Sequence, residues 1–127
     1  MSRESDPRAA ACEALCSVYD DVDDATAELR ERESVESTDD RRTVFAALAN
    51  DHRLRMLGAL RGGELCVCEL QYLLEAPQST VATHLSTLRE AGLVKTRKKG
   101  RWTYYRIADT AILEVLDLAA AIDVPDA

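Results

Sequence analysis

The chain has 127 residues, of which 46% are hydrophobic and 31% are charged. This length and composition favour one folded domain with a modest core and argue against a disordered protein. No apolar run approaches the roughly 18–20 residues needed to cross a bilayer, and the N-terminus lacks the apolar segment of a signal peptide, so we expect a cytoplasmic protein with no membrane partner.

The net charge of -7 is unevenly distributed along the chain. Residues 1–38 carry a net -7 and residues 107–127 a net -5, whereas residues 89–106 carry a net +6. A short basic segment can contact phosphates while the rest of an acidic protein repels them. The charge pattern therefore allows nucleic-acid binding by residues 89–106 despite the acidic total.

The N-terminal part of the sequence predicts one clear helix. Residues 1–11 are expected to be loose, and residues 21–33 have good helical composition with a thin apolar stripe. Cys12 and Cys16 are four residues apart, so one helical turn would place both thiols on the same face. We treat residues 1–38 as an N-terminal segment that carries this cysteine pair and a helix.

The main domain is expected to span residues 39–122, followed by a tail at residues 123–127. Hydrophobic periodicity predicts two helices on either side of Asn50-Asp51, and Gly62-Gly63 ends the second. A third, short helix is expected over about residues 67–74. Pro77 separates it from a fourth helix over about residues 79–91, whose inner face would consist of Val81, Leu85 and Leu88.

A β-hairpin is predicted after the fourth helix. Residues 93–97 and 102–107 are rich in β-branched and aromatic side chains, and residues 98–101 form the turn between them. A last helix over about residues 109–122 is so apolar that it favours a partner helix from a second copy of the chain. The expected fold is mainly α with a small β-hairpin: a dimeric winged helix-turn-helix.

The third and fourth helices and the hairpin form a candidate DNA-binding surface. A helix fits the major groove, which is about 12 Å wide, and the hairpin can reach phosphates or the minor groove beside it. The polar helix face and the basic hairpin could each be ordinary solvated surface, but their combination in this order favours double-stranded DNA. The candidate contacts are Gln78, Ser79, Thr80, Thr83, His84, Ser86, Thr87, Arg89, Arg97, Lys98, Lys99 and Arg101.

The four cysteines form two close pairs, Cys12 with Cys16 and Cys66 with Cys68. Thiolates are soft ligands that suit Cd(II), Pb(II), Zn(II), As(III) and Sb(III). Residues two apart lie about 200° apart around an ideal helix, so Cys66 and Cys68 could share an ion only at a helix start, where Gly62-Gly63 would place Cys66. Four thiolates would form a tetrahedral site, and three would suit pyramidal Pb(II) or As(III).

Several motifs in residues 39–122 are similar to those of one known family. Residues 46–57 resemble its opening helices, and residues 81–85 and 88–94 resemble its recognition helix and strand entry. The segment Glu64-Leu65-Cys66-Val67-Cys68-Glu69-Leu70 is close to its metal-binding box. The family is that of the ArsR/SmtB metal-sensing repressors, and Cys12-Glu13-Ala14-Leu15-Cys16 is similar to its cadmium- and lead-responsive branch.

The resemblance implies a homodimeric repressor that binds operator DNA and releases it when a soft metal or metalloid ion binds. It assigns Cys12, Cys16, Cys66 and Cys68 as ligands, with the N-terminal pair of one protomer completing the site of the other. No organic cofactor is implied. Residues 109–122 contain no histidine, so we expect the second metal site that some members carry there to be absent. The family often has Ser where this chain has Ala82.

Three other interpretations use the same residues. The thiols could form a redox sensor on the same fold, since exposed thiolates oxidise to disulfides. They could also hold a purely structural ion in a constitutive DNA-binding protein. An enzyme is not expected, because the sequence contains no Cys-x-x-Cys motif and no nucleotide-binding loop.

Overall fold

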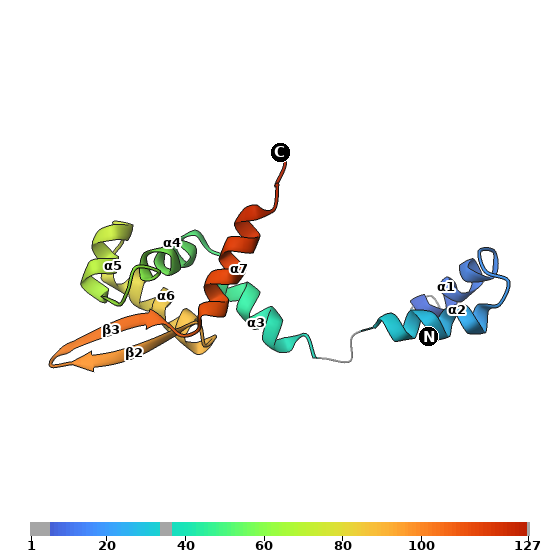
Figure 1. Ribbon diagram of the computed structural model, residues 1–127, viewed down its shortest axis with the longest axis horizontal. Helices are drawn as coiled ribbons and strands as arrows, with labels where there is room; N and C mark the ends of the chain where they lie inside the picture. The colour runs from blue at the N-terminus through green and yellow to red at the C-terminus, as the bar shows by residue number, and fades with distance from the viewer. Residues whose placement is uncertain (1–5, 34–36, 127) are drawn as a thin grey trace. The chain divides into compact units, whose positions relative to one another are not determined.

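The computed structural model describes residues 6–33 and 37–126, which belong to two structural units, Met1–Ser37 and Thr38–Ala127. The first unit is helical, and the second consists of helices and a small antiparallel sheet (Figure 1). The prediction of a mainly α winged helix-turn-helix is thus confirmed. Within the described ranges, no helix has the length and apolar content required to span a membrane.

The first unit is a pair of helices, α1 (Pro7–Cys16) and α2 (Val22–Arg32). Asp6 caps α1 by accepting hydrogen bonds from the backbone N–H groups of Arg8 and Ala9, at 3.1 and 3.3 Å. Pro7 suits the first helical position because it has no N–H to satisfy there. The expectation of a loose chain was therefore wrong for residues 7–11, while residues 1–5 lie outside the described part.

The second unit contains the four predicted helices of the main domain and the terminal helix. They are α3 (Asp39–Leu48), α4 (Asp51–Leu60), α5 (Val67–Leu74), α6 (Gln78–Glu90) and α7 (Thr110–Ala121). Asn50 caps α4 through a 3.1 Å hydrogen bond from the Arg53 N–H to its side-chain oxygen. Between α5 and α6, Glu75 adopts a left-handed conformation with φ 51°, and Pro77 takes the N-cap position of α6.

The sheet has three antiparallel strands, β1 (Leu65–Cys66), β2 (Val94–Lys99) and β3 (Trp102–Ile107), in the order β1-β3-β2. The hairpin of β2 and β3 was predicted, whereas β1 was not. β1 is only two residues long and is defined by its pairing with β3, where Cys66 lies opposite Tyr104. On the other side of β3, Arg97 lies opposite the same tyrosine.

The core of the second unit lies among α4, α5 and α6. Val81, Leu85 and Leu88 are at most 1% exposed, which confirms the predicted inner face of α6. They pack in one cluster with Met56, Leu57 and Leu70. Burial of this stripe orients the polar side of α6 away from the core. In contrast, Phe45 on α3 and Leu118 on α7 remain 59% and 69% exposed.

Candidate functional site

The polar face of α6 carries eight of the predicted DNA contacts. Thr80, His84 and Thr87 are half-buried at its edges, whereas the other five are exposed: Gln78, Ser79, Thr83, Ser86 and Arg89. The apolar residues on the inner side of α6 pack against α4 and α5, and these polar residues therefore lie on its other side. α6 is thus packed against the core on one face and presents mostly short polar side chains on the other.

Two threonines on this face use their hydroxyl groups within the helix. Thr83 Oγ1 donates to the Ser79 carbonyl at 2.9 Å, and Thr87 Oγ1 donates to the Thr83 carbonyl at 3.2 Å. A hydroxyl has one hydrogen and two lone pairs. In this arrangement, Thr83 and Thr87 therefore present methyl groups and acceptor oxygens.

His84 is held by an arginine that our reading of the sequence left without a role. Arg53 Nη1 lies 3.1 Å from His84 Nδ1, and the same guanidinium donates to the carbonyls of Ala47 and Ala46 at 2.5 and 3.3 Å. Arginine only donates, so Nδ1 accepts and the neutral ring carries its proton on Nε2. Arg53 thus connects the end of α3 to α6.

A second histidine packs against this contact. The rings of His52 and His84 lie edge to face, with their centroids 5.3 Å apart. Burial lowers the pKa of His84, and the charges of His52 and Arg53 lower it further. His52 Nδ1 is buried without a hydrogen-bond partner in the described part of the chain. The surroundings of His84 therefore favour the neutral ring that the Arg53 hydrogen bond requires.

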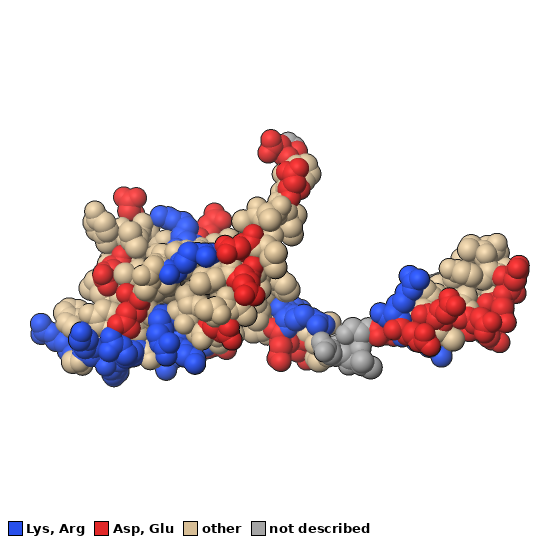
Figure 2. Space-filling model, viewed as in Figure 1, with Lys and Arg blue, Asp and Glu red and all other residues tan. Residues whose placement is uncertain are grey.

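The wing formed by β2 and β3 carries the other four predicted DNA contacts, all exposed. Figure 2 shows lysine and arginine side chains gathered where this hairpin lies. They are Arg97, Lys98, Lys99 and Arg101. At the tip, the Arg101 guanidinium lies over the Trp102 ring, 5.4 Å from its centroid. The wing is thus a basic projection beside α6.

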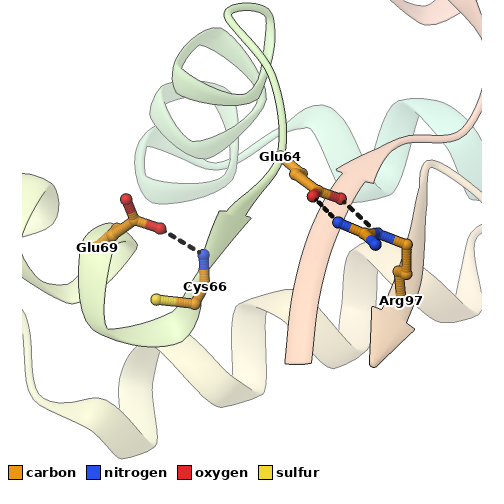
Figure 3. Close-up of polar contacts among 4 residues, drawn as sticks. All are labelled: Glu64, Cys66, Glu69 and Arg97. Atoms are coloured by element: carbon orange, nitrogen blue, oxygen red, sulfur yellow. Dashed lines mark hydrogen bonds and ion pairs between the residues drawn. The ribbon is translucent and has the colours of Figure 1, made fainter. Parts of the chain in front are cut away.

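One of these wing cations is already paired within the protein. Arg97 Nε donates to Glu64 Oε2 at 3.1 Å, and its Nη2 also contacts Oε1 of the same carboxylate (Figure 3). The hydrogen bond from Arg97 lowers the pKa of Glu64 and, reciprocally, Glu64 raises the pKa of Arg97. Sequence reasoning missed this pair because its members are 33 residues apart, and no local pattern indicates their contact.

Cys66 lies at the junction between β1 and α5. It is the N-cap residue of α5, with an extended backbone (φ -91°, ψ 171°), as the expected position at a helix start requires. Its N–H donates to the Glu69 carboxylate at 2.9 Å (Figure 3). Cys66 is half-buried, whereas Cys68, in the first turn of the helix, is exposed. Both cysteines therefore lie at the start of one helix. Because the backbone of Cys66 is extended, the roughly 200° separation of residues two apart in an ideal helix does not apply to this pair.

A groove lies beside Cys68 in the second unit. It has a volume of about 930 Å³ and is lined by α5 and by the turn that leads to α6, including Gln71, Tyr72 and Pro77. The Tyr72 side chain is 82% exposed. A ligand or a further protein donor can thus approach Cys68 from solvent.

Cys12 and Cys16 lie on α1 in the other structural unit, and both are exposed free thiols. Cys12 also lines a hollow of about 210 Å³ between α1 and α2, together with Leu15 and Leu29. Among residues 6–33 and 37–126, the structure brings no three metal-ligating side chains together. The structure thus describes each cysteine pair in its own unit and leaves the four-cysteine site a prediction.

The comparisons with known proteins agree with this geometry. The family model described as bacterial regulatory protein, arsR family, matches residues 50–96, which cover α4, α5 and α6 and reach into β2. The cadmium resistance transcriptional regulatory protein CadC of Listeria innocua is 32% identical over 108 residues, which are 84% of this chain and 87% of that protein. The chain belongs to the ArsR family.

Two further similarities concern this ArsR-family chain. The arsenic resistance transcriptional regulator ArsR1 of Pseudomonas putida is 54% identical over 65 residues, 50% of this chain, and the chain spans only about half of that relative (51%). A structure from Mycobacterium bovis, described as a homodimeric winged helix-turn-helix DNA-binding domain, has a TM-score of 0.62 at 30% identity. It covers 69% of this chain and 87% of its own.

Proposed function

We propose that the protein is a transcriptional repressor that binds double-stranded operator DNA as a homodimer. It releases that DNA when a soft metal or metalloid ion binds its cysteine thiolates. The observation that carries the proposal is the position of Cys66 and Cys68 at the start of α5, because α5 packs directly on α6. Ion binding at the thiols would thus act on α5, which packs against the proposed DNA-binding helix α6.

DNA binding is supported by the two surfaces that the second unit presents. α6 offers short polar groups suited to base edges, and the wing offers cations suited to phosphates. Two protomers would place their α6 helices in successive major grooves, with half-sites about 34–36 Å apart.

A dimer is supported by apolar surface on the terminal helix and on α3. Leu118 and Ile122 at the end of α7 are 69% and 67% exposed, and Phe45 on α3 is 59% exposed. Val44 of α3 and Val115 of α7 line one hollow, so these helices are neighbours. Apolar patches of this kind mark interaction sites. The homodimeric description of the Mycobacterium bovis domain favours a second copy as the partner.

Metal response is supported by four free thiols and by the names of the relatives, which refer to arsenic and cadmium. Cys66 and Cys68 would hold a soft ion, and Cys12 and Cys16 from the partner protomer would complete its coordination. Thiolates held by one ion adopt a fixed geometry, and a coupling free energy of about 1–3 kcal/mol to DNA binding would suffice for a useful switch.

The second candidate is a thiol redox regulator on the same fold. It is favoured by the exposure of Cys12, Cys16 and Cys68 as free thiols, because accessible thiolates oxidise readily. In that case, peroxide would release the DNA, and a dithiol reductant would restore binding without any metal.

Fluorescence anisotropy separates these functions. The metal-free, reduced protein first selects a labelled duplex from a random library, and the complex is then titrated with Cd(II), Pb(II), Zn(II) and As(III) in turn. Release by at least one ion is expected. If no ion releases the duplex but peroxide does, the redox function replaces the metal response. If neither does, the thiols have no regulatory role.

A further inference from the structure

The Glu64–Arg97 ion pair lies between the cysteine box and the wing. Glu64 is two residues before Cys66, and Arg97 is in the middle of β2. Their side chains are 31% and 50% exposed, so solvent can reach the pair, and a phosphate can compete for the guanidinium. Among the described residues, the other three predicted contacts of the wing form no ion pair; they are Lys98, Lys99 and Arg101.

The sheet connects the same two places through a second path. Cys66 on β1 and Arg97 on β2 both lie opposite Tyr104 of the central strand, and paired positions project to one face of a sheet. The Arg97 guanidinium lies 6.0 Å from the Tyr104 ring centroid. Cys66, Tyr104 and Arg97 therefore form one row across the three strands. From the end of that row, Arg97 turns toward Glu64 (Figure 3).

We propose that Glu64 competes with DNA phosphate for Arg97 and thereby links the thiols at the start of α5 to the wing. A guanidinium that is bidentate to a carboxylate has fewer donors left for a phosphate. Glu64 and Cys66 belong to one short segment, so a movement of Cys66 that brings its sulfur toward that of Cys68 also moves Glu64. This inference rests on the proposed function: its metal-free part requires only the proposed DNA binding, and its metal-dependent part also requires the proposed response of the thiols.

The test begins without metal, using the full chain and a duplex selected by the wild-type protein. Glu64→Gln removes the competing charge and should tighten binding about two- to five-fold, the size expected of an exposed pair. The dependence of log K on log salt should also steepen by up to about 0.9, the slope of one additional phosphate contact. Glu28→Gln on α2 makes the same charge change at an exposed site and should alter neither value.

A double-mutant cycle assigns the effect to Arg97. In an Arg97→Ala background, Glu64→Gln should no longer tighten binding, because the cation that it releases is absent. If Glu64→Gln tightens binding equally in both backgrounds, or behaves like Glu28→Gln, the competition is refuted. Circular dichroism melts of each variant verify that the wing remains folded.

The metal-dependent arm uses Cd(II). Its affinity for the thiols is followed by the ultraviolet thiolate-to-metal charge-transfer band, and release is followed by anisotropy. Glu64→Gln should leave Cd(II) affinity unchanged but reduce the ratio of DNA affinities without and with Cd(II). An unchanged ratio overturns the link to the thiols. If no ion releases DNA from the wild-type protein, the proposed metal response fails, and the proposed link between the thiols and the wing fails with it. The competition between Glu64 and phosphate for Arg97 is still decided by the double-mutant cycle.

Discussion

Replacement of Arg53 by methionine should destabilise the second unit and weaken DNA binding together. Methionine retains an unbranched apolar side chain but loses every donor of the guanidinium. In the wild-type protein, these donors hold two carbonyls at the end of α3 and Nδ1 of His84 on α6. The variant thus releases α6 from the end of α3 without creating a cavity in the core.

The magnitude follows from the three lost hydrogen bonds. A hydrogen bond to a charged group contributes about 1.5–3 kcal/mol, but one of the three bonds is exposed and the other two are only part-buried, so water replaces much of the loss and we expect a total of about 2–3 kcal/mol. At about 4–8 °C per kcal/mol for a domain of this size, the melting temperature should fall by roughly 10–20 °C.

The assay is urea unfolding followed by circular dichroism, with Arg55→Met as the matched control. Arg55 lies on the same helix, and its guanidinium donates from Nη2 to the Leu73 carbonyl at 3.0 Å. Its replacement should cost only about 0.5–1 kcal/mol. If the two variants unfold within about 0.5 kcal/mol of each other, Arg53 does not anchor α6 and our reasoning is wrong.

Three other predictions concern the thiols, pH and assembly. Cys66→Ser and Cys68→Ser should each retain operator binding but lose metal-driven release in the anisotropy titration, and release by both variants would refute the ligand assignment. Because the pKa of folded His84 is lowered from 6.5, its contribution to the free energy of unfolding is present above pH 6.5 and is lost as the pH falls below that value. Urea unfolding at several pH values should show this loss, and the slope should be shallower in His84→Gln; equal slopes would contradict the argument. Leu118→Glu places a charge on the exposed apolar end of α7 and should shift the protein toward monomers in sedimentation velocity. An unchanged sedimentation coefficient would exclude this surface from the interface.

The helices of the second unit were predictable because their signals are local. Asn50 and Asp51 mark the start of α4, and Val81, Leu85 and Leu88 follow the spacing of one buried helix face. The start of α1 also has a local signal, Asp6-Pro7 before an alanine-rich run, although residues 1–11 were expected to be loose. By contrast, β1 exists only through its pairing with β3, and no pattern within two residues can indicate it.

In the candidate site, too, the features within one helix or hairpin were predictable and the contacts between elements were not. Its parts that share one element, the polar face of α6 and the basic residues of the wing, could be predicted from spacing and charge. The contacts that connect elements could not, because Glu64 with Arg97 and Arg53 with His84 are pairs 33 and 31 residues apart. The sequence shows which side chains are available, but the packing of α4, α5 and β3 decides which of them meet.

The back-bonded threonines of α6 limit which bases that helix can distinguish. With their hydroxyl hydrogens donated to Ser79 and Thr83 carbonyls, Thr83 and Thr87 can only accept hydrogen bonds or offer methyl groups. In the major groove, the matching partners are the amino groups of adenine and cytosine and the methyl group of thymine, whereas guanine presents only acceptors there. Discrimination at the positions that these two residues face would therefore be directed against guanine, which leaves any guanine contact to donors such as Gln78 or Arg89.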